Sequence, residues 1–211
     1  MPVATPRRTQ AQRRAATIER LINACIDVLA ESGYAGAGVK AICDRAGLSQ
    51  GALFRHFDTR IELLVATVDV IGQRNVDTFR QFALSVSPDN IDGQLGRIVA
   101  LMRALSRSEL QAAWREVIAA ARTHPDLGVA AEGAVLRLET SIIDVVNQMF
   151  DVAEADRLEV GTTVLSLLHM FDSEAVTVAV QQSPEIEAVR LRWAEGILRD
   201  LLQRFGPGAR R

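Results

Sequence analysis

The amino-acid sequence predicts an all-α fold of about nine helices, and three observations support this prediction. Apolar residues recur at helical spacing through most of the 211-residue chain. Glycine and proline residues fall between these apolar stripes, at positions where helices begin or end. The stretch Val176–Val180 is rich in β-branched residues, but its flanks are helical and no partner strand is evident, so we expect it to be helical.

Residues 39–57 predict two short helices joined by a tight turn. Apolar residues at i, i+3, i+4 and i+7 predict the first helix over 39–46. Gly47 follows directly and suits the left-handed conformation that ends many helices. Ser49 can then cap the second helix by accepting a hydrogen bond from the backbone N–H of Ala52.

The second helix, over about Gln50–His56, has one apolar edge and one polar surface. Leu53 and Phe57 are spaced to anchor it in the core, which leaves amide, guanidinium and small side chains for other contacts. Such side chains suit base edges and phosphates, and two helices joined by a tight turn are an element that places a helix in the major groove of DNA. The pattern therefore predicts DNA binding.

Similar signals predict the helices on either side of this element. A first helix carries one apolar stripe and ends at Gly33. Thr59 can cap a helix that continues to about Leu84, before a turn-rich break over Ser85–Asp92. Later stripes and boundary residues predict helices over about 95–105, 108–122, 129–152, 155–182 and 185–205.

Glycine, apolar and aromatic residues keep fixed spacings around the two short helices. These residues are Gly33-Tyr34, Val39, Ile42, Ala46-Gly47-Leu48-Ser49, Gly51, Leu53-Phe54, His56-Phe57, Arg60 and Glu62-Leu63-Leu64. Together they resemble the N-terminal domain of TetR/AcrR-type transcriptional regulators, without gaps over about Arg13–Leu64. Three positions depart from the usual pattern of that family: Ala37-Gly38 stands where Thr is common, Phe54 where Tyr is common, and Arg60 where Lys is common.

The resemblance implies a DNA-binding head of three helices, residues 1–64, followed by a larger helical body, residues 65–211. Within the head we expect Arg55 to read guanine and Gln50 to read adenine, because their side chains can make paired hydrogen bonds to those bases. Phosphate contacts would fix the register without reading sequence. The predicted DNA-binding residues are Lys40, Ser49, Gln50, Gly51, Ala52, Phe54, Arg55, His56 and Arg60, with Lys40, His56 and Arg60 on phosphates.

For the body, the resemblance implies homodimerisation through the last two long helices, so that two heads read a near-palindromic operator. These helices carry more apolar residues than a monomer is expected to hide: Val160, Val164, Leu167, Leu168, Phe171, Val178, Ile186, Val189, Trp193, Ile197, Leu198 and Leu201. The resemblance also implies a repressor that a small apolar effector releases from DNA. Candidate effector-binding residues are Met102, Trp114, Met149, Phe150, His169 and Phe171. An activator of the same fold is an alternative, because the sign of regulation depends on where the operator lies.

Charge is distributed unevenly between the two predicted domains. Residues 1–64 hold nine Lys or Arg against six Asp or Glu, whereas residues 65–211 hold fifteen against twenty. Arg7, Arg8, Arg13 and Arg14 concentrate positive charge just ahead of the first predicted helix, as expected for an arm that contacts DNA. The acidic body argues against a protein that packages DNA without sequence preference.

Nothing in the sequence predicts an enzyme, a cofactor or a metal site. His169, Asp172 and Glu174 lie close together, but no nucleophile motif, phosphate loop or metal-ligand spacing accompanies them. Cys25 and Cys43 fall on apolar stripes, which favours reduced core thiols over a redox pair. No apolar run approaches the ~18 residues of a membrane-spanning helix, and the N-terminus lacks the apolar segment of a secretory signal, so we expect a cytoplasmic protein.

Overall fold

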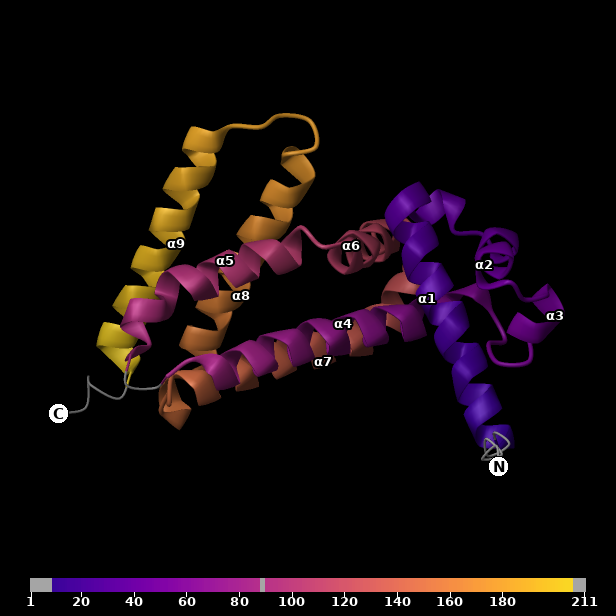
Figure 1. Ribbon diagram of the computed structural model, residues 1–211, viewed down its shortest axis with the longest axis horizontal. Helices are drawn as coiled ribbons and strands as arrows, with labels where there is room; N and C mark the ends of the chain where they lie inside the picture. Colours follow the sequence, from indigo (N-terminus) through magenta and orange to yellow (C-terminus); the bar gives the residue numbers. More distant parts are fainter. Residues whose placement is uncertain (1–8, 88–89, 207–211) are drawn as a thin grey trace, which may run out of the picture. The chain divides into compact units, whose positions relative to one another are not determined.

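The structure is a computed structural model that describes residues 9–87 and 90–206 (Figure 1). These residues form nine α-helices and no strand, which confirms the predicted all-α class. The α-helices are α1 (Gln10–Gly36), α2 (Val39–Ala46), α3 (Gln50–Leu53), α4 (Arg60–Ser85), α5 (Leu95–Ser106), α6 (Glu109–Ala121), α7 (Pro125–Met149), α8 (Arg157–Thr177) and α9 (Pro184–Phe205). Two short 3-10 helices cover Asp92–Gln94 and Glu154–Asp156.

The chain divides into two compact units. The first unit extends to Val70 and also takes in Ala113–Ala131, and the second contains Ile71–Ala112 and the residues from Glu132 onward. The structural division therefore falls later in the chain than residue 64. It also groups Ala113–Ala131 with the head, although the sequence analysis assigned this segment to the body. As a result, α4, α6 and α7 each contribute residues to both units.

Helix ends in the first unit follow the local sequence signals. Gly33 has φ 69° and interrupts the regular helix of α1, as the prediction of a helix end at this residue requires. Gly47 has φ 63° and closes α2 in the left-handed conformation. Its N–H donates to the carbonyl of Asp44 at 3.2 Å, and the N–H of Leu48 donates to the carbonyl of Cys43 at 2.9 Å. This pair of bonds satisfies carbonyls that the helix end would otherwise leave open.

The core of the first unit is formed by the predicted apolar stripes. Its fully or nearly fully buried members include Leu21, Cys25, Leu29, Ile42, Cys43, Leu53, Phe57, Leu63, Leu64 and Val68. Burial raises the pKa of the Cys25 thiol to about 11, and burial likewise raises the pKa of Cys43. Both cysteines are free, so the structure supports the interpretation of two protonated core thiols.

The second unit is built around α5, which packs against both α8 and α9 (Figure 1). The buried residues between these helices include Leu95, Ile98, Met102, Val164, Phe171 and Leu198. Where α7 meets α8, Gly161 is buried against the side chain of Ile143. A Cβ atom at Gly161 would lie 2.7 Å from Ile143 Cγ1, so the absent side chain allows this close approach.

Two helices end earlier than predicted, and a third begins earlier. The α3 helix stops at Leu53 rather than His56, and α8 stops at Thr177, so residues 178–180 form a turn instead of continuing the predicted helix. β-branched residues have low helix propensity, and Val180 is exposed, so no core contact compensates for that propensity. The α7 helix begins earlier than predicted, with Pro125 in its first position.

The basic arm also differs from its prediction. Arg13 and Arg14 lie within the first turns of α1, whose N-terminus is capped by a reciprocal pair of hydrogen bonds between Thr9 and Gln12. The helix starts this early because the capping pair satisfies its first N–H groups. Arg7 and Arg8 lie outside the described residues.

Half of the apolar residues that were assigned to a dimer surface are buried inside the single chain. These are Val160, Val164, Leu167, Phe171, Leu198 and Leu201. The helix over residues 95–105 was predicted, but its packing against α8 and α9 was not, and α5 covers these residues within the second unit. Ile186, Val189 and Trp193 remain exposed on α9. Among the described residues, no helix is long and apolar enough to cross a membrane.

Replacing Gly161 with Ala should destabilise the protein, because the new methyl group would overlap Ile143. We expect the free energy of unfolding to fall by about 1–3 kcal/mol, as is usual for an overpacked core. Urea unfolding at a fixed protein concentration measures the change. Gly96→Ala is the matched control, since a Cβ there meets the Glu195 carboxylate at an ordinary 3.8 Å. Equal stability of the two variants would show that the Gly161 contact is not limiting.

Candidate DNA-binding surface

The α3 helix is a single turn that is fixed at both ends. At its start, the Ser49 hydroxyl accepts a hydrogen bond from the Ala52 N–H at 3.1 Å, which confirms the predicted cap. The side chains of Leu53 and Phe57 are buried, as predicted from their spacing. These contacts hold the backbone of residues 50–56 against the core while the opposite side faces solvent.

The solvent side of this segment presents four chemically different groups. Gln50, Gly51 and Arg55 are exposed, and the ring of Phe54 is 46% exposed. An exposed amide, an exposed guanidinium and a bare backbone at glycine are groups that contact bases and phosphates. The partly exposed ring of Phe54 adds an apolar surface beside them.

Ala52 and His56 are half-buried, so they contribute to the same surface from its edge. The Nδ1 atom of His56 is buried and has no hydrogen-bond partner among the described residues. A buried nitrogen without a partner is unfavourable.

Lys40 lies on the exposed side of α2 but is paired within the chain. Its Nζ lies 2.6 Å from Oδ2 of Asp44, one turn further along the helix, and both side chains are largely exposed. This hydrogen bond raises the pKa of Lys40. A phosphate would have to share or replace the Asp44 carboxylate, so the net charge that Lys40 offers to DNA is smaller than its position suggests.

Arg60 is engaged inside the first unit. Its Nε donates to the carbonyl of Ala37 at 2.8 Å, and its Nη2 donates to the carbonyl of Tyr34 at 2.6 Å. The guanidinium also lies 4.3 Å from the centre of the Tyr34 ring. These contacts tie the start of α4 to the last turn of α1 and to Ala37, which follows it. A phosphate at Arg60 would have to compete with them.

Tyr34 also contacts the segment from α6 to α7. Its backbone N–H donates to Oε2 of Glu116 at 3.0 Å, and its ring centre lies 5.0 Å from that of His124. The positive φ of Gly33 turns the backbone here, and a Cβ at Gly33 would come within 2.9 Å of Glu116 Oε2. Sequence reasoning missed this junction because Glu116 lies 82 residues from Tyr34, beyond any local spacing rule.

Known proteins resemble this chain in both sequence and structure. The family model described as "Bacterial regulatory proteins, tetR family" matches residues 21–67. An uncharacterized HTH-type transcriptional regulator of Mycobacterium tuberculosis (strain H37Rv) is 31% identical over 192 residues, which cover 90% of this chain and 97% of that protein. The chain belongs to the TetR family of transcriptional regulators.

Other similarities agree with membership of the TetR family. The HTH-type transcriptional regulator CymR of Pseudomonas putida is 38% identical over 84 residues, 40% of this chain and 41% of CymR. A crystal structure assigned to the TetR family, from Mesorhizobium loti, superposes with a TM-score of 0.71 at 20% identity, covering 92% of this chain and 98% of that one. TetR-family proteins are DNA-binding regulators and not enzymes. Within the described ranges, no three His, Cys, Asp or Glu side chains are grouped to hold a metal ion.

The effector-binding residues predicted for this TetR-family regulator do not form one group. Met102, Phe150 and Phe171 lie in the core of the second unit, and Met149 packs against that core. Trp114 belongs to the first unit. His169 is exposed on α8. Their role in effector binding stays a prediction.

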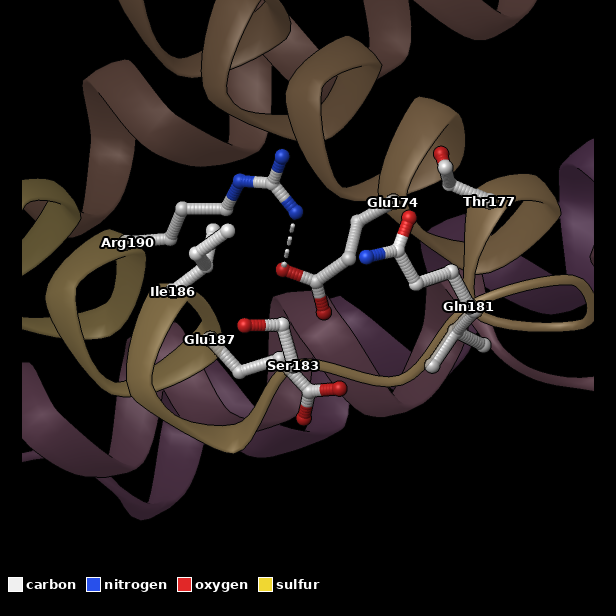
Figure 2. Close-up of a pocket in the computed structure, with 8 residues that line it drawn as sticks. Glu174, Thr177, Gln181, Ser183, Ile186, Glu187 and Arg190 are labelled. Atoms are coloured by element: carbon white, nitrogen blue, oxygen red, sulfur yellow. Dashed lines mark hydrogen bonds and ion pairs between the residues drawn. The ribbon is translucent and has the colours of Figure 1, made fainter.

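A pocket in the second unit is lined by other residues (Figure 2). It has a volume of about 90 Å³ and lies between the end of α8, the following turn and the start of α9. The lining residues are Glu174, Thr177, Val178, Gln181, Ser183, Ile186, Glu187 and Arg190. None of them was proposed as an effector contact, because the turn over residues 178–180 was predicted to be helical.

Arg60→Lys should destabilise the regulator although it preserves the charge. A lysine cannot donate to two carbonyls in the same fork or stack as a flat group on Tyr34. We expect the free energy of unfolding to fall by about 1–3 kcal/mol, measured by chemical denaturation. Arg55→Lys is the control, since exposed surface substitutions usually change stability by less than about 0.5 kcal/mol. Unchanged stability of Arg60→Lys together with weaker binding to all DNA sequences would instead assign Arg60 to a phosphate.

Proposed function

We propose that the protein is a dimeric repressor that binds a near-palindromic operator and is released by a small effector. The observation that carries this proposal is the surface of residues 50–56, where buried Leu53 and Phe57 hold exposed Gln50 and Arg55 outward. A single head of this size makes few base contacts. In a dimer, two heads would read half-sites about one turn of the DNA helix apart, ~34–36 Å. Specificity would then come from the base contacts of both heads together.

Separate roles follow for the exposed side chains of this surface. Arg55 would donate two hydrogen bonds to guanine, and Gln50 would pair with adenine. Ala52 would contact a thymine methyl group, and Gly51 would let the backbone approach closely. Lys40 and His56 would contact phosphates, while Ser49 mainly caps α3.

The apolar stripe on α9 supports dimerisation. Ile186, Val189 and Trp193 recur at i, i+3 and i+7 along one face, and each is more than half exposed. Exposed indole, isoleucine and valine side chains in a row are typical of a protein–protein interface. We therefore place the dimer contact on this face of α9.

The effector would act by changing the distance between the two heads. Helix α4 runs without interruption from Arg60 to Ser85 and contributes to both compact units, so it is the natural lever between them. An effector that prefers a conformation with wrongly spaced heads would shift the population away from DNA. We propose a cytoplasmic location because the operator is chromosomal. The alternative is a transcriptional activator of the same fold: the protein would activate transcription if its operator lay where the bound protein assists RNA polymerase.

Selection of bound sequences from a random DNA pool tests the proposal directly. Recovery of two similar half-sites in inverted orientation is the expected result, because two copies of the same surface read them. Arg55→Ala should lose preference at one base pair in each half-site, worth about 1–3 kcal/mol of discrimination. A pool that shows no enrichment would contradict sequence-specific binding.

Lys40→Ala is the matched variant for a residue that contacts phosphate. Its affinity should fall by a similar factor on every sequence, and its dependence on salt should flatten by about one ion per head. Binding isotherms at several salt concentrations measure both effects. If Lys40→Ala and Arg55→Ala change sequence preference in the same way, the assigned roles are wrong.

Trp193→Glu should convert the dimer to monomers, because a charge would be buried in the apolar α9 contact. Sedimentation velocity measures the state of association, and affinity for the full operator should fall while the fold, followed by circular dichroism, is retained. Leu84→Glu is the control, since Leu84 is also an exposed apolar residue but lies on α4. A Trp193→Glu variant that remains dimeric would move the interface away from this stripe.

A further inference from the structure

The pocket at the start of α9 has a charged floor and polar edges (Figure 2). Its floor is the carboxylate of Glu174, whose side chain is only 2% exposed. Around it, the guanidinium of Arg190 and the amide of Gln181 lie on opposite sides of Glu174, and Ser183 and the second carboxylate, Glu187, lie below it. Val178 and Ile186 add apolar wall.

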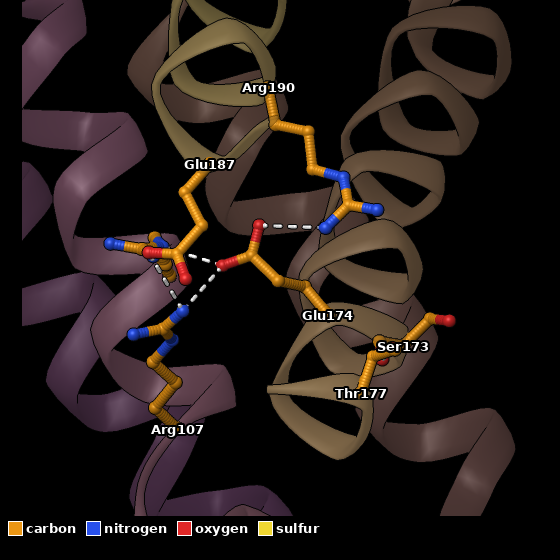
Figure 3. A network of polar contacts seen from close by, with 7 residues as sticks. Arg107, Ser173, Glu174, Thr177, Glu187 and Arg190 are labelled. Carbon is orange, nitrogen blue, oxygen red and sulfur yellow. Dashed lines mark hydrogen bonds and ion pairs between the residues drawn. The ribbon is translucent and has the colours of Figure 1, made fainter. Parts of the chain in front are cut away.

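The Glu174 carboxylate is held by three arginines: Arg103 of α5, Arg107 directly after α5 and Arg190 of α9. Figure 3 shows Arg107 and Arg190 on either side of it. Its Oε1 accepts from Arg103 Nε at 2.6 Å and from Arg107 Nη2 at 2.8 Å. Its Oε2 lies 3.4 Å from Arg190 Nη1. Glu187 also accepts hydrogen bonds from Arg103 and lies 3.4 Å from Arg107. Three guanidinium groups against two carboxylates leave this cluster with one excess positive charge.

Arg190 makes the longest contact with Glu174 of the three arginines, so it is the one best able to bind an additional acceptor. A distance of 3.4 Å is longer than an ordinary N–H···O hydrogen bond, whereas Arg103 and Arg107 bond Glu174 at normal lengths. Within the described residues, no other hydrogen bond or ion pair engages the Arg190 guanidinium. Its remaining N–H groups form an edge that matches a carboxylate.

The start of α9 adds donors on the same side of the pocket. Ser183 occupies the capping position of this 22-residue helix, but its side chain makes no capping hydrogen bond. Pro184 has no N–H, and the Glu187 N–H donates to the carbonyl of Ser183 at 3.0 Å. The helix therefore leaves the N–H groups of Glu185 and Ile186 without a carbonyl partner of its own, and its positive end favours a negative acceptor. A volume of about 90 Å³ equals roughly three water molecules, which suits a carboxylate with a short carbon chain.

We propose that this pocket binds a small monocarboxylate, with its carboxylate on Arg190 and its carbon chain against Val178 and Ile186. A single negative charge matches the excess of one positive charge in the cluster. The site is separate from the surface of residues 50–56 and goes beyond the proposed repressor function, as an additional input on the helix that carries the apolar stripe.

Titration of the full-length protein with sodium propionate, followed by amide NMR without DNA, tests the proposal. The expected result is a saturable shift of the amide signals of Ser183 and of residues 185–187, with a dissociation constant in the millimolar range that suits so few atoms. Arg190→Gln should weaken binding by about tenfold or more, because a charge-assisted hydrogen bond is lost. Glu174 keeps its bonds to Arg103 and Arg107 in this variant, so the fold should be retained.

Two controls separate the pocket from general attraction to positive charge. Arg199→Gln removes an arginine from the same helix that bonds Asp92 and Glu195 outside the pocket, and it should leave propionate binding unchanged. Propionamide has the same shape without the charge and should not bind. Equal binding of propionate and propionamide, equal effects of the two arginine variants, or no saturation would each overturn the proposal. Because the titration contains no DNA, these results do not bear on operator binding.

Discussion

The DNA-binding surface depends on the left-handed backbone of Gly47. This residue lets α2 end abruptly, and the bonds from Gly47 and Leu48 back to α2 fix the direction in which the chain leaves. Arg20 of α1 reinforces the end by donating to the carbonyl of Ala46 at 2.6 Å. With the direction set, buried Leu53 determines which side of α3 faces outward. The residues that orient α3 are thus different from those on its exposed side, so the exposed positions can vary while the head keeps its geometry.

Short-range features of the head were predictable from the sequence, but contacts between residues far apart in the chain were not. The bounds of α2, the cap at Ser49 and the turn at Gly47 were all predicted correctly, because an apolar stripe, a hydroxyl and a glycine act over a few residues. The grouping of Ala113–Ala131 with the head and the internal contacts of Arg60 depend on residues far apart in the chain. Spacing alone cannot reveal such pairs. The end of α8 was predicted too late for a related reason. Val180 is exposed and so gains no core contact that would compensate for its low helix propensity, and its burial could not be known from the sequence.

In the first turns of α9, charged side chains contact the rest of the second unit and apolar side chains are exposed, which is the opposite of the usual arrangement. Glu187 and Arg190 contact side chains of α5 and α8, while Ile186, Val189 and Trp193 are more than half exposed, with Ile186 also at the edge of the pocket. The inward charges are tolerated because they are paired: burial opposes ionisation of Glu174, yet hydrogen bonds from Arg103 and Arg107 outweigh it and lower the pKa of this carboxyl. Directional ion pairs hold this end of α9 in place of core packing, whereas Ala194, Leu198 and Leu201 are buried further along it. The exposed apolar stripe of α9 is therefore available for contact with another protein surface.

The sharing of α4, α6 and α7 between the two units limits how this protein could arise by exchange of gene segments. A recombination point after residue 70 would transfer the helix-turn-helix without Ala113, Val117 and Leu127, which are fully buried and belong to the same compact unit. A hybrid built that way would need matching apolar side chains from its new body. Transfer of the head alone would therefore leave buried positions of its core without their partners from α6 and α7.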